Sequence, residues 1–193
     1  GELSTTEPTG EPPDEFTYDP RDPVMSLMGL DSQTAPRDQS PLDGRGDILV
    51  YQTPPLEQGI EIVGPVELRL WAMSSAPDTD FTAKLVDVHP SGLAVNLTYG
   101  IMRASYRDGF ENPTPMEPGR PYEFVIKLRP TGVLLGPGHR LRLDVSSSDF
   151  PNFDRNHNTG KDFWSDAELK VARQTVMHDS DHPSRLVLPM VED

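Results

Sequence analysis

The chain has 193 residues, and 31 acidic against 17 basic side chains give a net charge of −14. This charge argues against nucleic acid and anionic membrane as partners, because both are bound through basic surfaces. The absence of cysteine excludes disulfides, thiolate metal sites and a cysteine nucleophile, and a chain of this length can bury a core without such staples.

The first 45 residues differ in composition from the remainder of the chain, residues 46–193. Residues 7–23 are acidic and rich in proline, with Phe16 and Tyr18 as the few apolar anchors, so they indicate a linker or tail. The Met-Ser-Leu-Met-Gly stretch at 25–29 places apolar side chains in a loop context. Such side chains either pack over the end of a sheet or meet a partner. We interpret the first 45 residues as a lead-in segment with an interface loop, followed by one folded domain.

Alternating apolar and polar residues predict short β-strands along the folded domain. The clearest candidates are Val66–Ala72, Tyr122–Leu128 and Arg140–Val145, and the others are Asp47–Thr53, Phe81–Val88, Leu93–Tyr99, Gly100–Tyr106, Gln174–His178 and Arg185–Leu188. Charged side chains on the second face of these strands, such as Glu67, Arg69, Arg140 and Arg142, suit water. Eight or nine strands with one polar face each predict an antiparallel two-sheet sandwich.

Helices are expected to be almost absent, because 21 prolines are spread along the chain. One short helix is predicted from Ser165, since Glu168 three residues later completes a capping box. The apolar run at 132–136 is interpreted as a loop, and no run reaches the ~20 residues of a membrane span. The fold class is therefore all-β with at most one short helix.

Motifs that carry chemistry are missing from the sequence. It contains no G-x-S-x-G nucleophile elbow, no glycine-rich phosphate loop, no H-E-x-x-H and no dinucleotide fingerprint. We therefore expect no catalytic residue, no resident metal and no cofactor. A cysteine-free chain is typical of a reducing compartment, so we expect a cytoplasmic protein and leave secretion open.

Two clusters offer weaker alternatives. His178 and His182 flank two aspartates and could ligate a divalent metal, although a solvated turn is the favoured interpretation. Asp78 and Asp80 could offer carboxylates to calcium, but acids before a strand more often cap a turn. His89 and His139 lie at hairpin ends, and we expect them at the surface.

Several longer segments resemble the C-terminal domain of the Xaa-Pro dipeptidyl-peptidase and CocE/NonD hydrolase family. They run in the order of that family from about Phe16 to Pro189: Tyr18–Val24, Ser74–Val88, Gly100–Arg107, Gly136–Arg142, Ser146–Pro151, Arg155–Thr159 and His182–Pro189. The resemblance implies a jelly-roll β-sandwich of galactose-binding-like topology, packed against an α/β-hydrolase domain and a helical cap domain of the same polypeptide. The family's catalytic triad lies upstream of this region, so no catalytic residue carries over. Members include dipeptidyl-peptidases, cocaine-type esterases, α-amino-acid ester hydrolases and glutaryl acylases.

The resemblance favours a non-catalytic domain that stabilises a serine hydrolase and borders its cleft. The loop at 25–29 departs from the Pro-Thr-x-Gly-Gly that relatives often carry beside the active site. Methionine, aromatic and arginine side chains are enriched at protein interfaces, which predicts this contact surface: Met25, Leu27, Met28, Phe150, Phe153, Asp154, Arg155, Asn156 and Trp164. The alternative is a carbohydrate-binding module, which needs exposed aromatics clustered at one loop end. Assembly into a homo-oligomer is left open.

Overall fold

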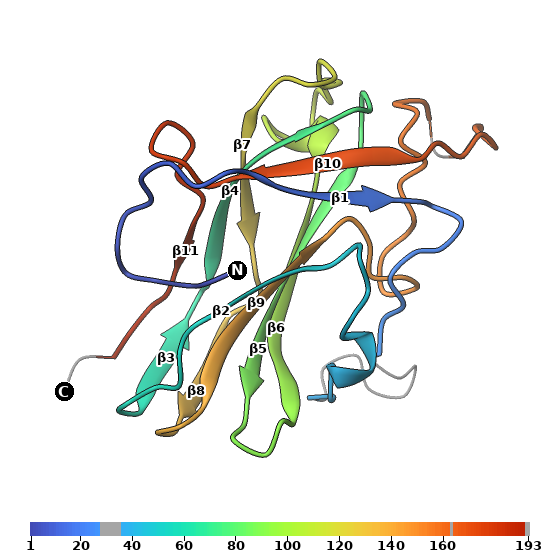
Figure 1. The fold of residues 1–193 in the computed structure, drawn as a ribbon. Coiled ribbons are helices and arrows are strands. Elements are labelled where there is room, and N and C mark those ends of the chain that lie inside the picture. Colours follow the sequence, from blue (N-terminus) through green and yellow to red (C-terminus); the bar gives the residue numbers. More distant parts are fainter. Residues whose placement is uncertain (28–35, 163, 192–193) are drawn as a thin grey trace.

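A computed structural model describes residues 1–27, 36–162 and 164–191 and shows a β-sandwich, as the sequence predicted (Figure 1). The strands of the described part are β1 (Asp14–Tyr18), β2 (Leu49–Gln52), β3 (Ile60–Gly64), β4 (Glu67–Ser74), β5 (Asp80–Val88), β6 (Ala94–Arg103), β7 (Tyr122–Lys127), β8 (Thr131–Leu135), β9 (Arg140–Ser146), β10 (Ala172–Met177) and β11 (Arg185–Val187). All their pairings are antiparallel. The galactose-binding-like topology stays a prediction.

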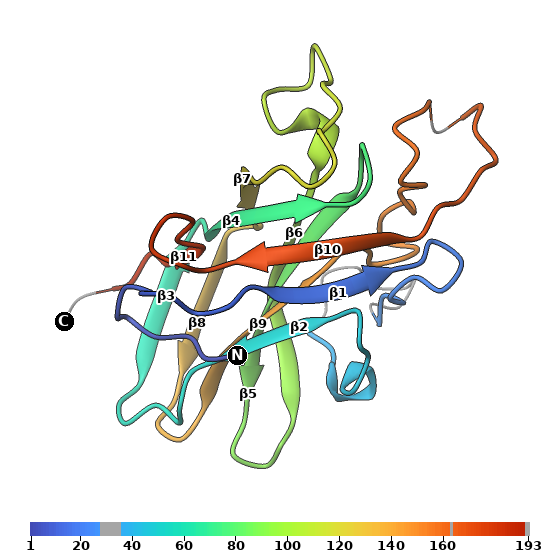
Figure 2. The same cartoon turned by 45° about the horizontal axis from the view of Figure 1, so that its top comes forward.

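Two sheets form the layers of the sandwich, and a strand pair extends them (Figures 1 and 2). The first sheet has the order β1-β10-β4-β11, with β7 also paired to β4. The second sheet has the order β2-β9-β5-β6, and β3 pairs with β8. This topology joins segments from both ends of the chain within one layer.

The core lies between the two sheets and is built by the predicted alternation. In β4 every second residue is buried, and the apolar ones are Leu68, Leu70 and Ala72. The rings of Phe81 in β5 and Phe124 in β7 lie 4.9 Å apart, so they join the two layers. Each fully buried side chain of this size stabilises the fold by about 1.5–3 kcal/mol. The apolar halves of the strands thus determine which faces meet.

The lead-in segment contributes a strand that its composition did not predict. β1 pairs along its whole length with β10, and Phe16 and Tyr18 are buried in the core. Two apolar residues separated by one residue are enough to anchor a strand in the core, because they lie on the same face of the strand. The Tyr18 hydroxyl donates to the carbonyl oxygen of Asn156 at 3.2 Å, and burial raises the pKa of this phenol. The linker interpretation is therefore wrong for these residues.

Two predicted strands are in fact one. β6 runs unbroken through Gly100, where a Cβ atom would lie 2.5 Å from the carbonyl oxygen of Lys127. Glycine at this position allows the backbone after β7 to approach β6 closely. The run interpreted as a loop at 132–136 forms most of β8, and β3 was not predicted at all.

The predicted helix at Ser165 is also wrong, since residues 164–165 form a turn. The Ser165 hydroxyl donates to Asp162, and the Glu168 carboxylate pairs with Lys161 at 3.0 Å, so the two residues do not form a capping box. The helices in the described part of the chain are the 3-10 turns η1 (Ser40–Leu42) and η2 (Ala104–Tyr106). None of the described helices could span a membrane.

Candidate functional site

The outer face of the second sheet is polar but does not face water. Its buried polar side chains are Thr82, Arg142, Asp144, Ser146, Ser148 and Asp149. The Arg142 guanidinium contacts Asp144 at 2.6 Å and Asp43, beside η1, at 2.7 Å. The expectation that Arg142 suits an exposed face is therefore wrong, because the segment around η1 covers it.

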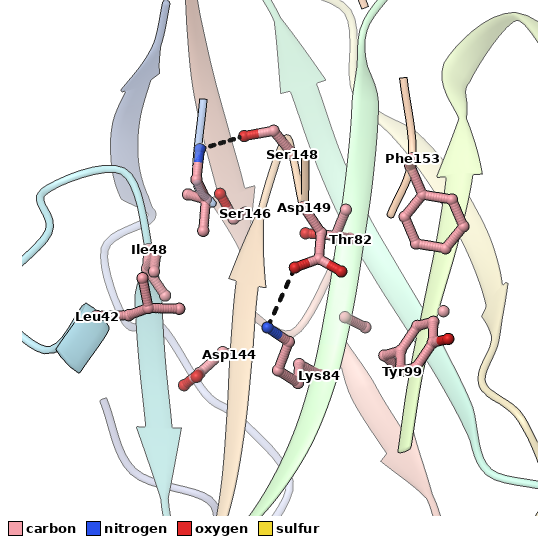
Figure 3. Close-up of a pocket in the computed structure, with 13 residues that line it drawn as sticks. Leu42, Ile48, Thr82, Lys84, Tyr99, Asp144, Ser146, Ser148, Asp149 and Phe153 are labelled. Carbon is pink, nitrogen blue, oxygen red and sulfur yellow. Dashed lines mark hydrogen bonds and ion pairs between the residues drawn. The ribbon is translucent and has the colours of Figure 1, made fainter. Parts of the chain in front are cut away.

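A shallow pocket lies in this covered face and encloses about 350 Å³ of empty space, part of which is open solvent. Figure 3 shows Lys84 and Asp149 pointing toward each other across it, with Phe153 and Tyr99 on one side. The Lys84 ammonium lies 3.3 Å from the Asp149 carboxylate and donates to the Gln39 side-chain oxygen at 3.0 Å. The lysine thus holds the covering segment against the sheet.

The loop at 149–159 is tied to the sheet by a buried charge network. Arg103 donates two hydrogen bonds to Asp80, at 2.8 and 3.0 Å, and a third to Asp154 at 2.9 Å. Asn156 donates to both Asp78 and Asp80. Burial raises the pKa of the Asp80 carboxyl, and the Arg103 guanidinium opposes that rise. These donors occupy the carboxylates proposed as an alternative calcium site, in keeping with the favoured turn-capping interpretation.

The two predicted interface stretches lie side by side. The backbone N–H of Ser26 donates to the Phe150 carbonyl at 2.7 Å, and Phe150 N–H donates to Val24 at 2.9 Å. Met25, paired with Phe150 in a short bridge, is 46% exposed. The Arg155 guanidinium donates to the Pro20 carbonyl and lies 5.4 Å from the Phe150 ring centre.

The remaining predicted residues differ in accessibility. Leu27 and Phe153 are half-buried, Asp154 is exposed, and Met28 lies outside the described residues. The Phe153 ring meets the Tyr99 ring edge-on at 6.0 Å. Asn156 is buried within the fold, so this side chain supports the loop from inside.

The most exposed aromatic side chains lie on two loops that project from the same end of the sandwich (Figure 2). Trp164 is 90% exposed and Phe110 is 80% exposed. Sequence reasoning missed Phe110, although it follows an Asp-Gly pair in which Gly109 has a φ of +134°. An apolar residue directly after such a turn signal is the pattern that would have found it.

The histidines around 178–182 do not converge on one point. His178 contacts Asp14 at 3.1 Å, whereas His182 contacts Asp179 and packs edge-on against Trp71 at 5.1 Å between ring centres. Each imidazole therefore makes a separate contact, and both side chains are only partly exposed, so the favoured interpretation of a solvated turn does not describe the two histidines.

Large aromatic side chains that are exposed at loop tips indicate an interaction surface, whereas the β-sandwich fold alone does not define a function. Residues 1–187 match the family described as the X-Pro dipeptidyl-peptidase C-terminal non-catalytic domain. The chain belongs to this family, and is a C-terminal domain of the kind found in CocE/NonD-type hydrolases.

Named relatives agree with this assignment. The chain is 43% identical over its whole length to cocaine esterase of Rhodococcus sp. (strain MB1 Bresler) and covers 34% of that protein. It superposes on an α-amino acid ester hydrolase with a TM-score of 0.91, 29% identity and 99% of the chain covered. It also superposes on an aminopeptidase from a marine sediment Thaumarchaeota archaeon, with a TM-score of 0.93, 27% identity and 100% of the chain covered. The chain spans 35% of each of these two structures, so it corresponds to about a third of its relatives' length.

Proposed function

We propose that this domain packs against an α/β-hydrolase catalytic domain and a helical cap domain of the same polypeptide, where it stabilises the enzyme and borders its cleft. The parent enzyme would hydrolyse esters or amides through a serine nucleophile outside this chain. Support comes from the names of the relatives, which are an esterase, an ester hydrolase and an aminopeptidase, and from the third of their length that the chain covers.

The observation that carries the proposal is the exposure of Trp164 and Phe110 at one end of the sandwich. A tryptophan that is 90% exposed leaves a large apolar surface in water, which is unfavourable unless a partner covers it. Tryptophan is also enriched among the residues that dominate binding energy at interfaces. The contact between Met25 and Phe150 provides a second apolar stretch, with Met25 46% exposed.

Substitution in the longer polypeptide tests the proposal. We expect Trp164→Ala to leave the melting temperature (Tm) of the 193-residue chain nearly unchanged, because 90% of this residue is already exposed to water. In the polypeptide that includes the catalytic domain, the same change should lower the free energy of unfolding by about 2 kcal/mol. Thermal unfolding of the 193-residue chain and urea denaturation of the longer polypeptide measure the two effects.

Leu134 provides a matched control, because it is 69% exposed on β8 and lies away from the loops that carry Trp164 and Phe110 (Figure 1). Leu134→Ala should change neither the short chain nor the longer enzyme. If both substitutions affect the longer enzyme equally, the aromatic end of the sandwich is not the contact surface.

The carbohydrate-binding alternative has one observation in its favour, which is the exposure of Trp164 and Phe110 at the same end of the sandwich. Trp71 lies on β4 and packs against His182, whereas Trp164 lies in the 157–169 loop, so the two tryptophans belong to different elements. A sugar platform needs such rings beside each other. Micromolar binding on a glycan array would revive this alternative.

A further inference from the structure

Three side chains converge at the end of the sandwich opposite the aromatic loops (Figure 1). Asp87 lies near the end of β5, His89 follows this strand directly, and His139 immediately precedes β9. The sequence alone indicated surface positions for both histidines. Both are instead half-buried, and Asp87 is buried. Their ligand atoms all lie within 4.8 Å of one another.

Strand register brings these residues together. β5 and β9 pair antiparallel, with Asp87 opposite Leu141 and Val88 opposite Arg140. If this register continues by one residue beyond both strands, His89 lies opposite His139. Asp87 and His89 are separated by one residue, so they lie on the same face of the strand pair. The three side chains therefore share one face at the point where the sheet ends.

Both imidazoles turn a nitrogen toward the same carboxylate. His139 Nδ1 lies 2.7 Å from Asp87 Oδ1, and His89 Nε2 lies 3.3 Å from Asp87 Oδ2. The two ring centres are 4.4 Å apart. Two imidazoles and a carboxylate that point at a common centre provide three ligands of the type that zinc binds in proteins.

The backbone around these ligands is held by tight turns. His89 N–H donates to the Leu93 carbonyl at 2.8 Å, and Gly92 N–H donates back to His89 at 2.9 Å. On the neighbouring turn, the His139 carbonyl accepts from Leu56 at 2.8 Å. Ligands that are already in place lose little conformational entropy when an ion binds.

We propose that Asp87, His89 and His139 form a binding site for a divalent transition-metal ion of the zinc type. Ligand atoms at about 2.0–2.1 Å from a tetrahedral ion lie about 3.3 Å from each other. The 3.3 Å distance between His89 and Asp87 involves Oδ2 of the carboxylate, whereas His139 lies 2.7 Å from Oδ1. Because the three ligand atoms lie within 4.8 Å of one another, side-chain rotations would bring them around one ion. Three protein ligands leave a position for water. The ion would clamp the β5–β6 turn to the β8–β9 turn.

Metal titration of the purified 193-residue chain tests this site. After treatment with a chelator, isothermal titration with ZnCl₂ should show one ion per chain, and zinc should raise Tm because it binds the folded state. Co²⁺ should give the visible absorption of a four- or five-coordinate site. Mg²⁺ and Ca²⁺ should not bind, because they prefer oxygen ligands.

Variants assign the ion to these residues. His89→Ala and His139→Ala should each weaken zinc binding more than about tenfold and abolish the rise in Tm. The double variant of His178 and His182 to alanine removes two histidines outside the cluster and should bind zinc normally. If His139→Ala fails to fold, His89→Ala decides, because its side chain lies on an outer turn.

The proposal is overturned by any of three results. These are no zinc binding at micromolar concentration, unchanged binding in His89→Ala, or loss of binding in the His178/His182 control. In the first case the three side chains form a hydrogen-bonded cluster without a metal.

Discussion

The two outer faces of the sandwich each carry an arginine paired with an acid two residues away on the same strand. On β4, Arg69 contacts Glu67 at 2.9 Å, and both side chains are partly exposed. On β9, Arg142 contacts Asp144 at 2.6 Å, and each side chain is 7% exposed. The sequence pattern is nearly the same, but one pair faces water and the other lies beneath the segment around η1.

The difference shows that alternation along a strand identifies the face that meets the core, but not what covers the other face. A partly exposed pair is screened by water and contributes little to stability. A buried pair has lost its hydration, so each member depends on the other. The environment, and not the residue types, determines the energetic role of the pair.

Replacing each arginine in turn should therefore give the largest difference in the free energy of unfolding between the two faces. We expect Arg142→Met to lower the free energy of unfolding by about 3 kcal/mol at neutral pH, because it leaves Asp144 buried without its closest cation. The matched change Arg69→Met should cost less than about 1 kcal/mol. Urea denaturation of the two variants measures both values, and equal losses would contradict the comparison.

The Arg142→Met loss should also depend on pH. Burial raises the pKa of the Asp144 carboxyl even with Arg142 present. Without the arginine this pKa rises further. The neutral carboxyl that is present at low pH then destabilises the fold little, whereas the charged carboxylate at neutral pH destabilises it strongly. The loss should grow as pH rises from acid to neutral, and a constant loss would show that packing, and not charge, causes it.

A smaller effect is expected where the covering segment is held by hydrogen bonds. Gln39 is fully buried, accepts from Lys84 and donates to the Arg37 carbonyl at 3.0 Å. Gln39→Ala should lower the free energy of unfolding by about 1–2 kcal/mol, because Lys84 then loses a buried partner. Glu15→Ala on the open face should stay within about 0.5 kcal/mol. A Gln39 variant as stable as that control would mean that the cover adds no stability.

The smallest effect concerns Asp38, which is exposed beside η1. Its carboxylate accepts from the Ser40 hydroxyl at 2.6 Å and from Ser40 N–H at 3.0 Å, and these bonds hold its pKa below the ordinary value of 3.8. A lowered folded-state pKa stabilises the fold above the ordinary value of 3.8, and this contribution is lost as pH falls toward and through the lowered pKa. Asp38→Ala should thus slightly lower Tm at neutral pH, and this effect should disappear as the pH falls through the lowered pKa. A loss that persists in acid would point to a different cause.

Sequence patterns predicted the strands whose side chains alternate strongly, such as β4, β7 and β9. They did not predict β1, because Phe16 and Tyr18 lie in an acidic, proline-rich context, or β8, because glycines at 132 and 136 suggested a loop. These strands depend on partners far away in the chain, which local patterns do not contain.

The sequence identified some segments of the candidate site but not how they meet, because their contacts also depend on residues far apart in the chain. Composition identified the two stretches around Met25 and Phe150, but their contact depends on backbone hydrogen bonds between distant segments. Asn156 was predicted as a contact residue without its buried partners Asp78 and Asp80 being foreseen. His89 and His139 lie on different turns, so only the pairing of β5 with β9 brings them to Asp87.

The pairing of β1 with β10 has a consequence for biosynthesis. Glu15 and Thr175 contact each other across 160 residues of sequence, so β1 has no partner strand until nearly the whole domain has been made. Contacts this distant in sequence form late, because the closure of a long loop precedes any gain from pairing. During translation β1 therefore remains without its partner strand, and the acidic side chains and prolines around it are of the kind that protects such edges from aggregation. Strands made late in the synthesis of this domain complete the sheet that holds its first strand.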